Sequence, residues 1–181
     1  MTPEPAIRDA LLAAVPSLRA FAISLSGQVD RADDLVQDTL LRALAHIDRF
    51  ERGTNLNAWL FTILRNLFHS EYRKRRREVE DPDGSYAGRL KVYPEQGARL
   101  DFEDFRTALT KLPHDQREAL LLVAASGFSY EETAAICGCA VGTIKSRVNR
   151  ARSRLAALLA VADVEDLGPD RMTRAAFQAI S

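Results

Sequence analysis

The chain has little of what marks several common classes of protein. It holds two cysteines in 181 residues, too few for the disulfide framework of a small secreted domain. These two, Cys137 and Cys139, have no second cysteine pair or histidine cluster nearby to complete the four ligands that zinc prefers. We therefore interpret them as small residues packed in a turn and expect no metal and no cofactor.

Long apolar runs are also missing. No run approaches the roughly 20 residues that span a bilayer. Acidic residues and prolines stand near the N-terminus, where a signal peptide is basic and then apolar. The sequence predicts a cytoplasmic protein with no membrane partner.

The marks of an enzyme are absent as well. No nucleophile, base and orienting group occur together, no glycine-rich phosphate loop is present, and His46, His69 and His114 lie on separate segments. We expect neither a catalytic residue nor a small-molecule substrate.

Net charge is zero, with 25 basic and 25 acidic residues, which by itself argues against a nucleic-acid partner. The distribution of charge is more informative. Acidic residues gather at 30–38, 78–83 and 101–104, and basic residues gather at 73–77 and 145–154. Separate acidic and basic surfaces predict more than one kind of partner.

Apolar periodicity predicts helices throughout and no strands. The first helix covers 5–26 and contains Pro16, a possible kink. The second covers 30–47, a turn follows at Gly53, and the third covers 56–77. In the second helix the residues expected to face inward are Leu35, Val36, Leu40, Ala43, Leu44 and Ile47.

The helical pattern breaks after residue 78 in a stretch with two prolines and three glycines. A loop of that length is uncommon inside one compact domain, so we interpret it as a flexible linker between two. The predicted fold is therefore all-α, with a first domain at 1–78, a linker at 79–100, a second domain at 101–160 and a C-terminal tail at 161–181.

Residues 127–159 are the most informative part of the chain. Ser129 and Glu132 form a capping box that predicts a helix starting at Tyr130, and Gly138 is suited to end it. The helix after the turn has an apolar stripe and an opposite basic face that contains no acidic residue. The stripe residues are Ile144, Val148, Ala151, Leu155 and Leu158, and the polar ones are Lys145, Ser146, Asn149 and Ser153, flanked by Thr143 and Arg150.

A helix-turn-helix whose second helix enters the major groove of DNA fits this pattern. A plain helical hairpin with a solvated basic face is the alternative. The coincidence of a short helix, a glycine turn and a basic helix free of acidic residues favours the DNA reader.

Three stretches together resemble a known family: DDLVQDTLLRAL from Asp33, NAWLFTILRNLFHSEYRKRRR from Asn57, and LPHDQREALLLVAASGFSYEETAAICGCAVGTIKSRVNRARSRL from Leu112. The chain is similar to bacterial RNA polymerase sigma factors of the extracytoplasmic function type, which have only sigma domains two and four. The third stretch is most similar to the EcfG-type factors of the alphaproteobacterial general stress response. The resemblance implies three partners, which are core RNA polymerase, promoter DNA and a NepR-like anti-sigma factor.

For the first domain, the resemblance implies two surfaces. Residues that would contact the polymerase clamp are Asp34, Gln37 and Asp38. Asn66 matches the family's pocket for an unpaired base of the minus-ten element, and Arg52, Thr54 and Asn55 lie on the adjoining loop. Phosphate contacts are expected from Arg65, Arg73, Lys74, Arg75 and Arg76, because such contacts are independent of base sequence. Trp59 is a possible stacking residue, but we favour a core position for it.

For the second domain, the resemblance places the basic helix in the minus-thirty-five element and the preceding helices on the polymerase flap. Lys145, Ser146, Asn149 and Arg150 would meet bases or adjoining phosphates, and Thr143 and Arg147 would hold the DNA backbone. The implied target of an EcfG-type factor is a GGAAC-like sequence.

Two other functions compete with a sigma factor. One is a sigma-like decoy that sequesters an anti-sigma factor without activating promoters, as in PhyR response regulators. That decoy is joined to a receiver domain, which this chain does not show, and the intact basic face favours a DNA reader. An ordinary helix-turn-helix repressor is the other, and the segments at Asp33 and Asn57 argue against it.

Overall fold

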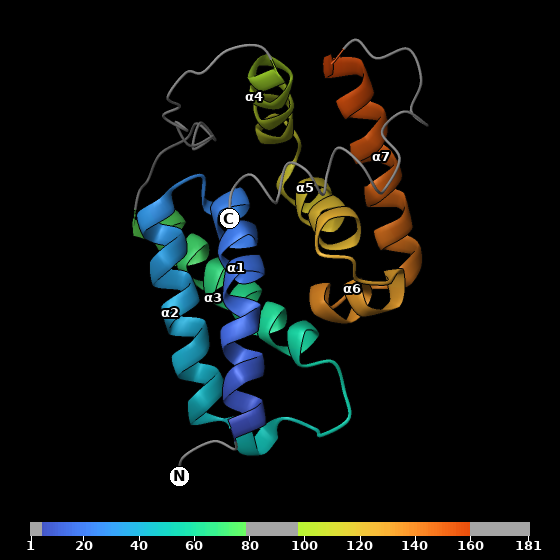
Figure 1. Cartoon of the computed structure of the whole chain (residues 1–181). Coiled ribbons are helices and arrows are strands. Elements are labelled where there is room, and N and C mark those ends of the chain that lie inside the picture. The colour runs from blue at the N-terminus through green and yellow to red at the C-terminus, as the bar shows by residue number, and fades with distance from the viewer. Residues whose placement is uncertain (1–4, 79–97, 160–181) are drawn as a thin grey trace. The chain divides into compact units, whose positions relative to one another are not determined.

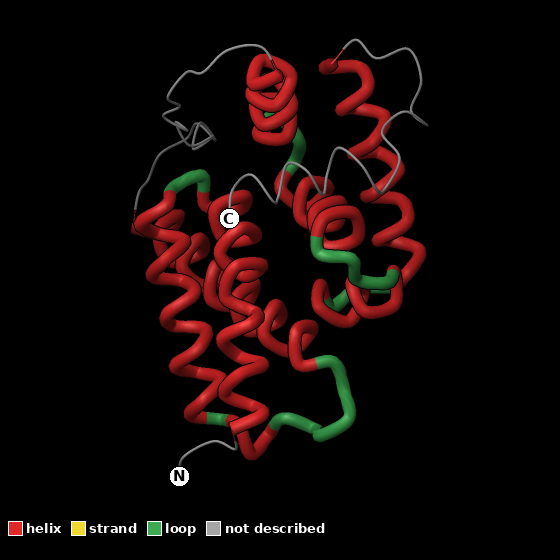
Figure 2. Tube along the Cα trace, viewed as in Figure 1, coloured by secondary structure: helices red, strands yellow, loops and turns green. Residues whose placement is uncertain are grey.

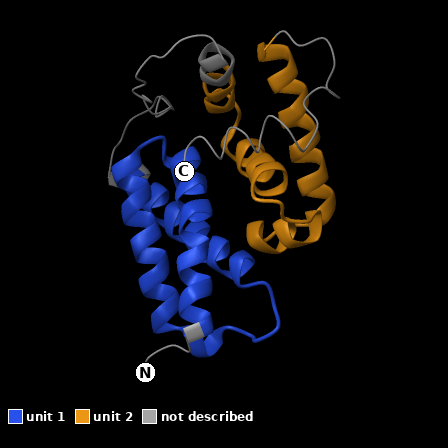
Figure 3. Ribbon diagram, viewed as in Figure 1, with its two compact units in different colours: residues 1–86 blue, residues 87–181 orange. Residues whose placement is uncertain are grey.

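A computed structural model describes residues 5–78 and 98–159, and every regular element in those ranges is helical (Figures 1 and 2). The chain divides into two compact units, residues 1–86 and 87–181 (Figure 3). The predicted all-α fold is confirmed. Most of the predicted linker and all of the predicted tail lie outside the described residues.

Unit 1 is built from three helices, α1 (Pro5–Ser26), α2 (Val29–Ala45) and α3 (Leu56–Glu78), with a short 3-10 helix at Ile47–Arg49. Each of the three helices packs against the other two. Phe21 of α1 and Phe61 of α3 meet at the centre, with ring centroids 5.1 Å apart and both side chains fully buried. The predicted helix bounds are right to within two residues at each end.

Helix α1 is apolar enough to need a further explanation. Residues Ala6–Ser26 are long and apolar enough, by length and composition, to cross a membrane. In unit 1 this helix supplies much of the hydrophobic core, including the fully buried Leu18, Phe21 and Ala22. Burial against α2 and α3 accounts for its apolar character.

The predicted core stripe of α2 is wrong at one edge. Leu35, Val36 and Ala43 are buried, but Leu44 is 41% exposed. At roughly 100° per residue, Leu44 lies beyond the edge of the stripe that Leu35, Thr39 and Ala43 define. The core includes Thr39 instead, whose hydroxyl donates a 2.7 Å hydrogen bond to the carbonyl of Leu35.

The connection between α2 and α3 turns at Gly53, whose φ of 91° favours glycine. The Asn55 side chain then accepts a 3.2 Å hydrogen bond from the backbone N–H of Ala58 at the start of α3. The Trp59 ring is half-buried and lies 5.4 Å from the Phe50 ring. Trp59 therefore packs against the loop that leads into α3.

Unit 2 contains α4 (Ala98–Thr110), α5 (His114–Leu120), α6 (Tyr130–Cys137) and α7 (Val141–Leu159). Pro113 immediately precedes α5, at its N-cap position. One π-helical turn, Leu121–Ala125, continues from α5, and no sequence signal marked it. Helix α7 packs against α4, α5 and α6, so unit 2 is organised around it.

The helix-turn-helix signals are confirmed. Ser129 and Glu132 exchange both bonds of the capping box, at 3.0 and 2.9 Å, and α6 begins at Tyr130. Gly138 ends α6 with a left-handed φ of 64°.

One residue of the predicted α7 stripe is misplaced. Ile144, Val148, Ala151 and Leu155 are buried, whereas Leu158 is 44% exposed and Ala156 is buried instead. Leu158 lies in the last turn of α7, which ends at Leu159.

Candidate nucleic-acid interface

The polar face of α7 lies opposite its buried stripe. Thr143, Lys145, Asn149 and Arg150 are exposed and Ser146 is half-buried. Ile144 and Val148 on the other side have no exposed surface, which fixes the rotation of the helix about its axis. The residues that we predicted to meet DNA therefore face away from the core of unit 2.

Two cations, Lys145 and Arg147, lie on the flanks of this face, and each contacts another side chain of unit 2. Lys145 lies on the side next to α6, with its Nζ 6.0 Å from the centroid of the Tyr130 ring. Arg147 lies on the other flank, where its Nε is 3.1 Å from Asp115 of α5 and its Nη1 donates to the sulfur of Cys139 at 3.8 Å. We predicted that Arg147 holds the DNA backbone, and in the structure its guanidinium also binds Asp115 and Cys139 within unit 2.

Both cysteines pack within the turn region. Cys137 is buried, and its thiol donates to the Glu118 carboxylate at 4.0 Å. Cys139 is half-buried and contacts Arg147.

Helix α5 brings charge under α7. Glu118 is 1% exposed. Burial lowers the pKa of the neighbouring Arg117, and the charge of Glu118 opposes that shift. Part of the charge of unit 2 therefore lies beneath its surface, which the charge count of the sequence does not reveal.

In unit 1, α3 carries a polar side opposite its buried face. Helical spacing places Thr62, Arg65, Asn66, His69 and Arg73 on this side. Asn66 and Arg73 are exposed and Arg65 is half-buried, and the Nε of Arg73 donates to the carbonyl of His69 at 3.3 Å. Lys74 and Arg75 are exposed on other sides of the same helix, and the side chain of Arg76 lies outside the described residues.

The predicted loop residues are exposed, but two of them also shape the loop. The hydroxyl of Thr54 donates to the carbonyl of Glu51 at 2.7 Å, and Asn55 caps α3 as described above. Arg52 lies beside Gly53 at the tip. Thr54 and Asn55 therefore set the path of the loop.

The acidic face of α2 is exposed at all three predicted positions, Asp34, Gln37 and Asp38. Leu41 lies on the same face and is 57% exposed, an apolar group that our sequence analysis did not include. Its spacing of three and seven residues from Asp38 and Asp34 was a signal that could have identified it. A single exposed leucine is common on protein surfaces, so Leu41 gains meaning only from its place on the same face as the predicted polymerase contacts.

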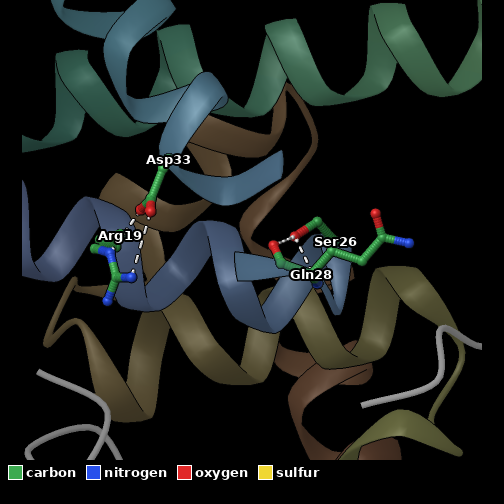
Figure 4. Close-up of polar contacts among 4 residues, drawn as sticks. All are labelled: Arg19, Ser26, Gln28 and Asp33. Carbon is green, nitrogen blue, oxygen red and sulfur yellow. Dashed lines mark hydrogen bonds and ion pairs between the residues drawn. The ribbon is translucent and has the colours of Figure 1, made fainter. Parts of the chain in front are cut away.

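Two ion pairs near this face are internal to unit 1. Arg19 of α1 binds Asp33 of α2, with Nε 2.6 Å and Nη2 3.4 Å from the carboxylate oxygens (Figure 4). The hydrogen bond to Asp33 raises the pKa of the Arg19 guanidinium. Arg31 lies 3.3 Å from Glu71 of α3 and over the Phe68 ring at 5.2 Å. These pairs join the helices. Asp33 is bound to Arg19 within unit 1, whereas its neighbour Asp34 belongs to the face that we predicted to contact polymerase.

Two family models match the chain, one to each unit. Sigma-70 region 2 matches residues 11–78, and sigma-70 region 4 matches residues 102–155. The match to region 2 covers α1 from Leu11 onward together with α2 and α3, and the match to region 4 covers α5, α6 and most of α4 and α7.

Individual proteins are also similar to this chain. It is 76% identical over 169 residues to the ECF RNA polymerase sigma factor EcfG of Rhodopseudomonas palustris, and the alignment covers 93% of each chain. It is 59% identical to the sigma factor RpoE of Bartonella quintana, solved in complex with the anti-sigma factor NepR, with a TM-score of 0.78 and coverage of 87% of this chain and 99% of that one. The PhyRSL–NepR complex from Sphingomonas sp. Fr1 has a TM-score of 0.63 at 22% identity, over 84% of this chain and 88% of that one, a likeness of fold alone.

The different environments of two arginines on α7 give a prediction. Arg147→Ala removes the bond to Asp115, so the free energy of unfolding of unit 2 should fall by about 1 kcal/mol, the upper range for a partly exposed ion pair. Arg150→Ala removes an exposed side chain and should change that free energy by less than about 0.5 kcal/mol. Thermal unfolding of the two variants measures the difference, and equal midpoints would contradict the assignment of Arg147 as a structural residue.

Proposed function

The chain belongs to the extracytoplasmic function sigma factors of RNA polymerase, and we propose that it directs transcription of general stress response genes under the control of a NepR-like anti-sigma factor. The identity to EcfG supports the stress assignment. The identity to a sigma factor solved with NepR supports the regulator. We propose that the protein acts in the cytoplasm with polymerase and takes no catalytic part, since polymerase forms the phosphodiester bonds.

One observation carries the proposal, which is the exposed basic face of α7 on a helix whose rotation is fixed by buried residues. A helix held in this way can enter the major groove of the minus-thirty-five element with Lys145, Ser146, Asn149 and Arg150 toward the base edges. The same face makes a decoy the weaker alternative, because sequestering an anti-sigma factor requires no DNA-reading surface. The likeness to PhyRSL extends only to the fold.

The polar side of α3 has the composition that strand separation requires. Opening a promoter means taking a base out of its stack, which costs a few kcal/mol. That cost is offset when polar groups bind the base edge and cations follow the backbone. We assign the base contact to Asn66 and the backbone contacts to Arg65, Arg73, Lys74 and Arg75, with Arg52 on the neighbouring loop.

The acidic face of α2 is the proposed contact with core polymerase. Asp34 and Asp38 supply charge, and the exposed Leu41, one turn beyond Asp38 on the same face, supplies apolar area. Charged groups around an apolar centre are the usual anatomy of a protein interface. The division of labour follows, with α2 on polymerase and α3 and α7 on DNA.

The α7 assignment predicts a selective defect. Lys145→Ala combined with Arg150→Ala removes two groove-facing cations, and each contact of this kind contributes about 1–3 kcal/mol. Affinity of the holoenzyme for promoter DNA should fall at least about 30-fold, while binding of the double variant to core polymerase is unchanged. Promoter binding and polymerase binding are measured side by side. An equal loss of both would contradict the division of labour.

The assignment of Asn66 predicts a dependence on the template. Asn66→Ala should slow open-complex formation about tenfold or more on duplex promoter and much less on a template already unpaired at the minus-ten element, because there the unstacking cost is absent. The matched control is Asn57→Ala, an exposed asparagine in the first turn of α3 away from its polar side. The same defect on both templates would overturn the assignment.

The acidic face predicts a defect in assembly. Asp34→Lys combined with Asp38→Lys replaces attraction by repulsion, so the affinity for core polymerase should fall tenfold or more and the loss should shrink at high salt. Asp9→Lys, a reversal at an exposed position on α1, is the control. Unaltered recovery of the double variant in a pull-down would remove this face from the interface.

A further inference from the structure

Tyr130 lies where it can control a DNA-reading residue. It is the first residue of α6, and the two bonds of the capping box fix the backbone on either side of that position. Its side chain is half-buried and its ring lies 6.0 Å from the Nζ of Lys145 on α7. The contact joins the two helices of the helix-turn-helix.

A lysine on a DNA-binding surface can contact either phosphates or base edges. Its ammonium is a point charge at the end of a flexible four-carbon stem, so an unrestrained lysine reaches several phosphates as easily as one base. Phosphate contacts carry no base preference, whereas contacts with base edges do. A lysine that reads sequence therefore needs something to restrict its direction.

The ring of Tyr130 supplies that restriction. The negative face of an aromatic ring attracts an ammonium group within about 6 Å of its centroid. Exclusion of water at a protein–DNA interface strengthens the attraction. On the opposite flank Arg147 is held by Asp115 and Cys139, so each flanking cation of α7 has a contact within unit 2. Asn149 and Arg150 lie between them on the exposed face.

We propose that Tyr130 is a positioning residue for minus-thirty-five recognition, and that the base preference read by Lys145 depends on the aromatic ring of Tyr130. The inference rests on the proposed function of α7 and goes beyond it by assigning a role to a residue of α6. The ring is the acting group, since the tyrosine hydroxyl takes no part in the contact.

The test uses the full-length chain assembled with core polymerase and a pool of promoter duplexes randomised across the minus-thirty-five element. Sequencing of the bound fraction gives a base preference at each position. Wild type is compared with Tyr130→Phe, Tyr130→Leu, Lys145→Ala and Arg154→Ala. Arg154 is an exposed arginine nine residues beyond Lys145 on α7. Tyr130→Met removes the ring with a more adaptable side chain, should the leucine variant fail to fold.

We expect Tyr130→Leu to reduce preference about two- to fivefold, the effect of losing an exposed cation–π contact. The reduction should occur at the same base positions that Lys145→Ala affects. In the Lys145→Ala background, Tyr130→Leu should add no further loss. Tyr130→Phe should keep the wild-type profile, and Arg154→Ala should weaken binding without changing preference.

Three results would overturn the inference while leaving the proposed function intact. These are a uniform loss of binding in Tyr130→Leu, a change at positions that Lys145 does not affect, or additive effects of the two substitutions. A loss of preference in Tyr130→Phe would assign the effect to the hydroxyl and also overturn it. If the wild-type holoenzyme selects no sequence from the pool, the proposed function itself fails.

Discussion

Burial of one apolar face on each helix is the constraint on which the rest of this structure depends. Ile144, Val148 and Ala151 are fully enclosed on α7, so rotating that helix would expose them to water. The opposite face is therefore presented to solvent whatever its own interactions are. The same constraint acts on α3, where Leu60 and Leu64 are fully buried and Asn66 is exposed. Hydrophobic packing therefore decides which polar groups of α3 and α7 face solvent, and the proposed contacts with DNA depend on that exposure.

The chain has no net charge, but its acidic and basic residues lie on separate surfaces. Several charges are used inside the units: Arg19 with Asp33, Arg31 with Glu71, and Arg147 with Asp115. The exposed charges of the described residues include an acidic face on α2 and basic groups on α3 and α7. Phosphate attraction needs only such local concentrations of charge, since interactions between exposed charges beyond about 8 Å are largely screened at physiological salt. A net charge of zero is thus compatible with a DNA-binding protein.

Local signals in the sequence are sufficient to predict most of the helices and their bounds. The Ser129–Glu132 capping box and Gly138 located both ends of α6, because each acts through hydrogen bonds and backbone angles within a few residues. Periodicity located the stripes but not their edges, so Leu44 and Leu158 were placed inside although neighbouring helices do not cover them. The partners of Arg147 and Lys145 were also beyond reach, since Asp115 and Tyr130 are distant in sequence and meet only through folding. Spacing identifies the face of a helix, whereas long-range contacts decide which of its residues are already engaged.

The central claim is that one chain joins polymerase to a chosen promoter. Run-off transcription with purified core polymerase tests it most directly, on a linear template that carries a GGAAC-type minus-thirty-five element. The account predicts a transcript from one start site when the chain is added and none from core polymerase alone. A transcript pattern that is the same with and without the chain would contradict it.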